Sequence, residues 1–365
     1  MPYLHLEQAF QLESGEQLDR LTIYYTTHGQ LNERRDNVVW VCHALTGNAD
    51  PVEWWPGLVG NGEVIDPQKH FIVCANMLGS CYGTTGPADF QPNSEDIYGL
   101  EFPLITTRDM ARLHQRLADH LGIDRIYLGI GGSMGGQQLL EWAVMAPTLF
   151  RHLCPLATNT RHSPWGIAFN EAQRMAMQAD ETLGTNQPEA GRKGLEAARA
   201  IAMLSYRHYR TYEDSQGEED VEKLVNYKAS SYQRYQGKKL WERFDPASYW
   251  VLSRAMDNHH LGRGRGDIAE ALGAIQAKTL VIGIDTDILF PVAEQSEIAQ
   301  MIPDSRFEII PSDFGHDGFL TETKAISLLL RDFLQGTFNG RKPSPMLRKS
   351  AAFKQNFVLP GSESF

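Results

Sequence analysis

The segment 131–135 has the sequence Gly-Gly-Ser-Met-Gly and holds a single serine, Ser133, among small residues. It matches G-x-S-x-G, in which a serine on a sharp strand-to-helix turn acts as a nucleophile. An apolar run at 125–131 predicts the strand before the turn, and an apolar stripe over 136–146 predicts the helix after it. The alternative is a glycine-rich turn whose serine only caps the helix. Because both flanks are of the required type, we favour a nucleophile, with the amide of Met134 as one oxyanion donor.

A nucleophilic serine also needs a base, and in this type of turn the base is a histidine that follows the serine and the acid along the chain. His316 lies in a polar loop directly after the apolar run 306–311. Loops at strand ends carry many catalytic groups, so His316 is our candidate base. His259 and His260 lie in a charged stretch, and we expect both at the surface.

Two aspartates compete for the role of the acid, because Asp285 and Asp287 both stand at the end of the predicted strand 279–285. Asp287 lies two residues farther into the loop and can reach sideways towards a neighbouring strand. Asp285 is suited to holding the turn through its own backbone. The spacing slightly favours Asp287 and leaves Asp285 open.

The second oxyanion donor is expected from the loop after an early strand. The predicted strand 38–44 runs into the small-residue turn 43–47, and the amide of Leu45 is our candidate. His43 in this turn precedes Ser133, which is the wrong order for a base, so we expect a packed structural histidine.

These residues need a mainly parallel sheet with helices on both faces, and the sequence predicts one. Strands are expected at 38–44, 71–77, 125–131, 279–285 and 306–311, with antiparallel edge strands in the first 30 residues, and core helices are expected at 107–121, 136–146 and 323–334. The strand pattern stops between 161 and 270, where helices are expected at 169–179, 194–206, 218–235 and 241–256. We therefore predict an α/β core from 1–160 and 271–340, a helical lid insertion at 161–270, and a C-terminal tail at 341–365.

The composition and net charge of the chain exclude several classes of protein. The 365 residues are 42% hydrophobic and 22% charged, as in globular proteins, and 34 basic against 45 acidic residues give a net charge of −11. Such a chain lacks the basic surface that nucleic acids and anionic membranes require. No signal peptide, membrane span or metal-ligand spacing is visible. The four cysteines show no CxxC spacing, so we expect a cytoplasmic protein without disulfides or a bound metal.

Several longer blocks resemble the homoserine O-acyltransferases, the branch of the α/β-hydrolase superfamily that acts in methionine biosynthesis. The blocks are HALTGNAD at 43–50, NMLGSCYGTTGP at 76–87, FPLITTRDM at 102–110, GGSMGGQQLLEWAV at 131–144, GIDTDILFP at 283–291 and GHDGFLTE at 315–322. The blocks extend over nearly the whole core, and they are more specific than G-x-S-x-G. The departures from the family pattern are LGSC, where the family usually has a second glycine, NAD after HALTG, and a lid with fewer matching blocks.

The resemblance implies a catalytic role for Ser133, with Asp287 as the acid and His316 as the base. It further implies that Asp317 binds the amino group of the substrate. In the lid, the family pattern Gly-Leu-x-x-Ala-Arg corresponds to 194–199 and implies that Arg199 is a substrate-binding residue, suited to a carboxylate. Tyr206, two helical turns farther on, is assigned to the same pocket.

The activity so implied is transfer of an acetyl group from acetyl-CoA to the hydroxyl of L-homoserine through an acyl-enzyme, with no permanently bound cofactor and with a homodimer expected. A polyanionic donor is repelled at long range by a chain of net charge −11, so the mouth of its tunnel must be locally basic. The alternatives are a succinyl-CoA donor, an L-serine acceptor, a plain serine esterase or thioesterase, and a non-catalytic binding protein with the hydrolase fold.

Overall fold

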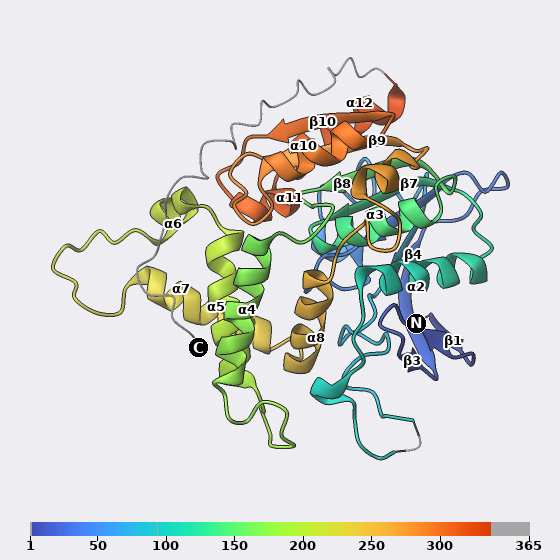
Figure 1. Ribbon diagram of the computed structural model, residues 1–365. Helices are drawn as coiled ribbons and strands as arrows, with labels where there is room; N and C mark the ends of the chain where they lie inside the picture. The colour runs from blue at the N-terminus through green and yellow to red at the C-terminus, as the bar shows by residue number, and fades with distance from the viewer. Residues whose placement is uncertain (1, 93, 337–365) are drawn as a thin grey trace.

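The sheet is the central feature of the computed structural model, which describes residues 2–92 and 94–336. Its eight strands run in the order β1-β4-β6-β5-β7-β8-β9-β10. They comprise β1 (Tyr3–Leu6), β4 (Leu21–His28), β5 (Val38–Cys42), β6 (Phe71–Ala75), β7 (Ile126–Gly132), β8 (Phe150–Leu156), β9 (Lys278–Ile284) and β10 (Ser305–Ile310). In this order, β6, β5, β7, β8, β9 and β10 are parallel to one another. At one edge, β4 pairs antiparallel with β6, and β1 pairs antiparallel with β4. A two-stranded ribbon, β2 (Phe10–Gln11) and β3 (Gln17–Leu18), lies beside this edge in Figure 1.

Helices cover both faces of the sheet, as predicted. Successive residues of its central strands point to opposite faces, so that an apolar strand has side chains to bury on each face. In β5, Trp40 packs in one apolar cluster together with α2 (Thr107–His120), α3 (Met134–Met145) and α10 (Val292–Met301). Its neighbour Val41 packs in a second cluster with α12 (Thr323–Gln335). Burial on both faces explains why the strands have continuous apolar runs instead of alternating ones.

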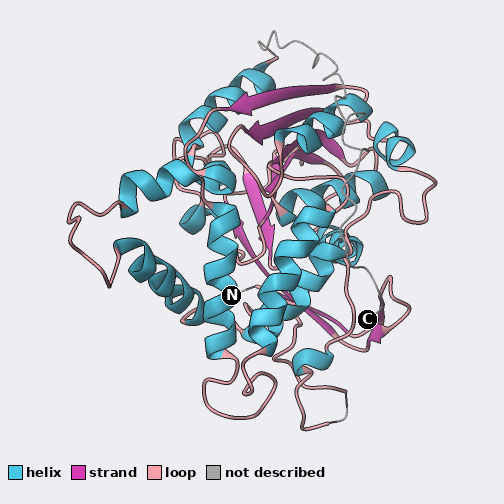
Figure 2. Cartoon of the chain, turned by 60° about the vertical axis from the view of Figure 1, so that its left-hand side comes forward, coloured by secondary structure: helices cyan, strands magenta, loops and turns pink. Residues whose placement is uncertain are grey.

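The chain between β8 and β9 forms the helices α4 to α9. They are α4 (Pro164–Gln178), α5 (Arg192–Tyr206), α6 (Tyr209–Gln216), α7 (Lys228–Trp241), α8 (Pro246–Asp257) and α9 (Ile268–Gly273). The pair α4 and α5, with α7 and α8 beside them, stands next to the end of the sheet at which α11 (Gly318–Thr321) lies (Figures 1 and 2). Short elements complete the core: α1 (Pro51–Trp54), η1 (Gly99–Glu101) and η2 (Gly315–Asp317).

The expected strands and core helices are confirmed, with most ends displaced by one or two residues. The helix expected at 218–235 is wrong. Its first half is a loop, and α7 begins only at Lys228. Val221, Leu224 and Val225 have the spacing of an apolar helix face, but they are 90, 82 and 66% exposed because no core lies beneath them. The positive φ of Asn226, 59°, also interrupts a helix at this point.

Three cysteines, Cys42, Cys74 and Cys154, are buried, and Cys81 is half-buried. All four are free, as the sequence predicted, and burial raises the pKa of the Cys42 thiol. Within the described residues, no helix combines the length and the apolar character that crossing a membrane requires. The predicted tail at 341–365 lies outside the described residues.

Candidate active site

Ser133 stands on the turn between β7 and α3 in a conformation that few side chains adopt. Its backbone has φ 56° and ψ −128°, and its side chain makes no hydrogen bond to the helix that it precedes. The cap interpretation is therefore wrong. A non-glycine residue in this region costs about 1–3 kcal/mol, and packing around the turn must impose it. The Ser133 carbonyl accepts hydrogen bonds from Thr158 Oγ1 at 2.8 Å and from the Gly136 amide at 2.9 Å, which fix the turn.

Glycines let the turn approach its neighbours closely. A Cβ on Gly135 would lie 2.1 Å from the Cys42 carbonyl oxygen, and one on Gly131 would lie 2.6 Å from the Gly135 carbonyl oxygen. The start of α3 can thus touch the end of β5 only if both positions are glycine. This contact brings the loop after β5 beside Ser133.

The histidine and the acid meet at the ends of β9 and β10. His316 Nδ1 lies 2.7 Å from Asp287 Oδ2, and both side chains are buried. Asp287 Oδ1 accepts hydrogen bonds from the amides of Leu289 and Phe290, each at 2.9 Å, so the carboxylate is fixed before it meets the ring. With Nδ1 engaged, Nε2 is the ring nitrogen left for other partners.

The choice between the two aspartates is decided by their partners. Asp285 Oδ1 accepts from the Ser312 amide at 2.9 Å and so ties the end of β9 to the end of β10. It holds the turn, as the sequence suggested, while Asp287 reaches His316. The ring of His316 also stacks on Phe290, with centroids 5.0 Å apart.

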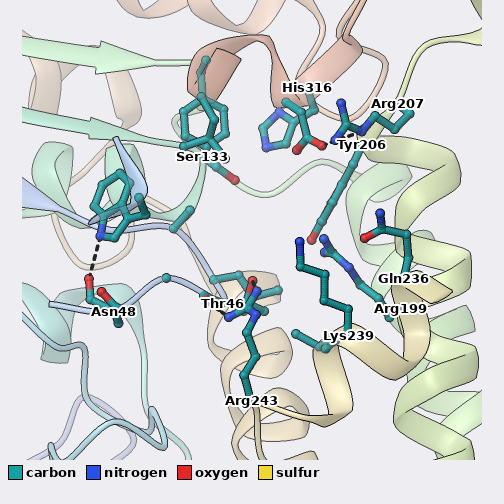
Figure 3. A pocket seen from close by; sticks show the side chains of 18 of the residues that line it. Thr46, Asn48, Ser133, Arg199, Tyr206, Arg207, Gln236, Lys239, Arg243 and His316 are labelled. Atoms are coloured by element: carbon teal, nitrogen blue, oxygen red, sulfur yellow. Dashed lines mark hydrogen bonds and ion pairs between the residues drawn. The ribbon is translucent and has the colours of Figure 1, made fainter. Parts of the chain in front are cut away.

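Ser133 and His316 line one cavity of about 510 Å³, and Figure 3 shows their side chains next to each other at its inner end. Leu45, the predicted source of the second oxyanion donor, also lines this cavity. Neither the Leu45 amide nor the Met134 amide donates a hydrogen bond to any of the described residues. Two unengaged N–H groups beside a serine are what an oxyanion requires.

Two histidines outside this group are structural. His43 is buried, its Nε2 accepts from the Met77 amide at 3.1 Å, and burial lowers its pKa to about 4, so it is the packed residue that we predicted. The expectation that His259 lies at the surface is wrong. It is buried and bonds to Thr107 Oγ1 at 2.8 Å, because the chain returns from the end of α8 into the core at this point. Its neighbour His260 is half-buried.

The helices opposite Ser133 give the cavity a charged wall. Its four basic side chains are Arg199 on α5, Arg207 directly after α5, Lys239 on α7 and Arg243 just after α7. The acids of the cavity, Asp317 in η2 and Glu53 in α1, come from the opposite side. Figure 3 shows Arg199, Lys239 and Arg243 extending into the cavity from the side away from Ser133. Four basic residues thus line this cavity, although the chain has a net charge of −11.

Two of the residues that the resemblance assigned to the substrate, Arg199 and Tyr206, lie on this wall, and the third, Asp317, faces it from beside His316. The guanidinium carbon of Arg199 stands 5.1 Å from the ring centroid of Tyr206, close enough for a cation–π contact. Burial raises the pKa of Tyr206. Asp317 directly follows His316 and is largely buried, and burial raises the pKa of its carboxyl, opposed by the nearby Arg207 and Arg199.

Three of the basic residues were missed from the sequence. Arg207 directly follows Tyr206, and its Nε lies 2.9 Å from Asp317 Oδ2. Arg243 Nη1 donates to the Thr46 carbonyl oxygen at 2.7 Å and so joins the helical wall to the loop of Leu45. None of the three had a local signal, because even Arg207 lies just after α5 in an extended conformation (φ −109°, ψ 145°) and outside the helical spacing.

This sheet, with its strained serine between β7 and α3 and its buried acid–histidine pair, defines an α/β hydrolase, and the family model of the alpha/beta hydrolase fold matches residues 37–323. Homoserine O-acetyltransferase from Cyclobacterium marinum is 51% identical over 329 residues, covering 90% of this chain and 93% of that protein. The crystal structure of homoserine O-acetyltransferase from Staphylococcus aureus has a TM-score of 0.77 at 29% identity and covers 93% of this chain and 97% of that one. The chain belongs to the homoserine O-acetyltransferase family.

The fold alone does not separate transferases from esterases. The structure of an acetylester hydrolase from Corynebacterium glutamicum reaches a TM-score of 0.81 at 24% identity, covering 92% of this chain and 96% of that one. What distinguishes the activities must therefore lie in the lining of the cavity.

Proposed function

We propose that this enzyme transfers the acetyl group of acetyl-CoA to the hydroxyl of L-homoserine, giving O-acetyl-L-homoserine for methionine biosynthesis. The observation that carries the proposal is the joint lining of one cavity: Ser133 and His316 at its inner end, and fixed charges of both signs, among them Asp317 and Arg199, on its wall. A simple alcohol offers nothing to such charges, whereas an amino acid has an ammonium and a carboxylate group. The 51% identity to a homoserine O-acetyltransferase supports the same choice.

The reaction proceeds in two half-reactions. His316 Nε2 takes the proton of Ser133 Oγ as the oxygen attacks the thioester carbonyl, and the amides of Leu45 and Met134 stabilise the oxyanion. The carbon–sulfur bond breaks, and the thiolate of coenzyme A leaves with the proton from His316. The homoserine hydroxyl then gives its proton to His316 and attacks the acetyl ester, which restores the Ser133 hydroxyl. Asp287 holds the imidazole and stabilises its protonated form.

Transfer competes with hydrolysis at the acetyl-enzyme stage. Water must be kept from the ester while the acceptor hydroxyl is held against it. The helices between β8 and β9 are suited to act as this lid, because they close one side of the cavity with Tyr206, Leu240 and the basic residues. Lys239 and Arg243 are suited to the phosphates of coenzyme A.

Release of free thiol from acetyl-CoA, measured with and without L-homoserine, tests the proposal. We expect homoserine to accelerate thiol release strongly, with one O-acetylhomoserine formed per thiol, and we expect Ser133→Ala to abolish both. Equal thiol release with and without homoserine would identify an esterase or thioesterase instead. Parallel assays with succinyl-CoA and with L-serine separate the remaining donors and acceptors.

The other predictions made from the sequence complete the proposal. We infer a cytoplasmic homodimer that holds no permanent cofactor and binds acetyl-CoA only as a substrate. Its partners are then two small molecules, the acyl donor and the amino-acid acceptor.

A further inference from the structure

The loop that follows β8, residues 157–163, lies between the segment of the nucleophile and the segment of the acid. On one side, Thr158 Oγ1 donates a hydrogen bond to the Ser133 carbonyl at 2.8 Å. On the other side, Gln295 on α10 donates through its Nε2 to the Thr158 carbonyl at 2.6 Å. This loop therefore joins the turn before α3 to the helix that follows Asp287.

A second connection across the same loop runs through side chains alone, and Asn159 is its centre. Gln137 Nε2, in the first turn of α3, donates to Asn159 Oδ1 at 2.9 Å. Asn159 Nδ2 in turn donates to Glu294 Oε2, in the first turn of α10, at 3.0 Å. Asn159 is only 2% exposed, and Gln137 is fully buried. The three side chains thus form one chain of hydrogen bonds between the starts of two helices.

The chemistry of Glu294 fixes the orientation of the asparagine. An ionised carboxylate can only accept hydrogen bonds, so Asn159 must turn its amide nitrogen to Glu294 and its amide oxygen to Gln137. The backbone of Asn159 is held as well, because its carbonyl accepts from Nε2 of the buried His259 at 3.1 Å. With its backbone and both ends of its side chain engaged, Asn159 keeps the two helix starts at a defined separation.

Glu294 supplies the ionisable group of this chain. Asp287 and Glu297 face it from its own segment, and Asn159 and Ser163 face it from the loop after β8. Burial raises the pKa of Glu294, and the hydrogen bond from Asn159 opposes this rise. A carboxylate in place of Asn159 would put two acids in contact, and one of them would have to hold a proton or move away.

We propose that Asn159 is a positioning residue of the acyl-transfer reaction, which holds the start of α3 against the start of α10 and so fixes Ser133 relative to the acid–histidine pair. The strained serine and this pair come from segments far apart in the sequence, so their separation depends on the contacts between these segments. A misplacement of about 1 Å between reacting groups can lower a rate about 100-fold. The inference rests on the proposed function, because it assumes that Ser133 is acylated with His316 as the base.

The test exchanges the donor and the acceptor of the contact between Asn159 and Glu294. In Asn159→Asp two carboxylates meet, and we expect kcat of acetyl transfer at pH 8 to fall about 10- to 100-fold, with the KM of both substrates unchanged. Glu294→Gln keeps an oxygen for Asn159 and should lose no more than about threefold in kcat. The double variant again places a donor opposite an acceptor, and it should recover most of the kcat that Asn159→Asp loses.

A matched control is available at a second buried asparagine. Asn170 on α4 is also 2% exposed and donates through Nδ2 to Asp257 Oδ1 at 2.7 Å, but this contact joins two helices of the insertion. Asn170→Asp should therefore lower the stability of the protein without lowering kcat per folded molecule. Labelling of Ser133 by a fluorophosphonate probe gives the folded, reactive fraction of each variant, so that kcat is compared on that basis.

The pH dependence separates positioning from a general loss of structure. Two carboxyl groups that share a site bind one proton more tightly than either would alone, and this proton restores a donor. The ratio of kcat in Asn159→Asp to kcat in the intact enzyme should therefore rise as the pH falls from 8 to 6, and the same ratio for Asn170→Asp should stay constant.

An unchanged kcat in Asn159→Asp, or a loss that the double variant does not recover, would overturn the inference. Hydrolysis of p-nitrophenyl acetate by the same variants also needs Ser133 and His316 but no amino acid, and it should show the same pattern. If the intact enzyme hydrolyses this ester but transfers no acetyl group to L-homoserine, the proposed function fails, and the ester assay still decides the role of Asn159.

Discussion

The two sides of the cavity differ in how firmly their residues are held. On the sheet side, Ser133, Asp287 and His316 are 6, 4 and 3% exposed, and each is fixed by short hydrogen bonds at the end of a strand. On the helical side, Arg207 is 22% exposed and meets its partner without an aligned hydrogen bond, and Lys239 makes no ion pair with the described residues.

The contrast suggests that one side of the cavity carries the reacting groups and that recognition of the substrates depends on the other charges that line it. A strained serine with a buried histidine and aspartate can form an acyl-enzyme in any hydrolase of this fold, and the acetylester hydrolase has the same architecture. In the proposed function, the charges that discriminate between water, alcohols and amino acids are the basic residues of the helical side together with Asp317 beside His316. Changes to Ser133, Asp287 or His316 should therefore abolish both half-reactions, and changes to these charges should alter substrate affinity alone.

The largest effect is expected for Asp287→Asn, compared with Asp285→Asn. The first change removes the carboxylate that orients His316 and stabilises its protonated form, and we expect kcat to fall about 10⁴-fold. Asp285 only ties Ser312 to the end of β9, so its variant should lose stability but little of its kcat. Stopped-flow thiol release and thermal unfolding of both variants distinguish the two cases. Similar kcat losses in both would contradict the assignment of the acid.

Asp317→Asn is expected to act on the acceptor alone. Removing the negative charge should raise the KM for homoserine about 10- to 100-fold. Formation of the acetyl-enzyme should be partly spared, because Asp317 does not contact Ser133. Steady-state kinetics with varied homoserine, alongside the burst of thiol without it, measure the two effects. A normal homoserine KM in this variant would rule out the role of Asp317.

Lys239 should have a smaller effect, confined to the donor. Lys239→Gln is expected to raise the KM for acetyl-CoA about threefold, and Lys239→Glu about tenfold, because a partly solvated charge contributes little. High salt should diminish the difference. Lys238→Gln on the same helix, whose lysine pairs with Glu242 outside the cavity, is the control. An unchanged KM for acetyl-CoA in both Lys239 variants would place the phosphates elsewhere.

The smallest effect is expected for Glu294 on α10, and it concerns the stability of the folded protein. Burial raises the pKa of Glu294 to about 7, although Asn159 donates to its carboxylate at 3.0 Å. The folded protein therefore holds this proton more tightly than the unfolded chain, and its stability falls as pH rises from about 4.5 to about 7.

Glu294→Gln removes this penalty and keeps an oxygen for Asn159. We expect its free energy of unfolding to exceed that of the intact protein by about 1–2 kcal/mol at pH 8, and by much less at pH 5. Urea unfolding at the two pH values measures the difference. Glu33→Gln, an exposed glutamate in the loop before β5, serves as the control. A difference that is the same at both pH values would show that Glu294 does not titrate in this range.

Most of the sheet side could be predicted from the sequence, although β8 was missed, and much of the helical side could not. Strands buried on both faces have continuous apolar runs, and the order of Ser133, Asp287 and His316 follows the connectivity of the fold. The structure agrees with these positions to within one or two residues.

The helical side depends on how the helices dock against the core, which local sequence does not encode. Arg207 becomes part of the site only because the end of α5 touches the histidine loop at Gly315. Two wrong predictions, the helix at 218–235 and the surface position of His259, have the same origin. In both cases an apolar or charged pattern was interpreted without its tertiary partners.

The acetyl-enzyme is the central claim, and intact-protein mass spectrometry tests it most directly. After incubation with acetyl-CoA, the account predicts a mass increase of one acetyl group, located on Ser133 by peptide mapping and lost when L-homoserine is added with release of O-acetylhomoserine. Ser133→Ala should show no adduct, and Ser230→Ala, a change on the exposed face of α7, should behave as the intact protein does. An adduct on another residue, or homoserine acetylation that proceeds equally well in Ser133→Ala, would contradict the account.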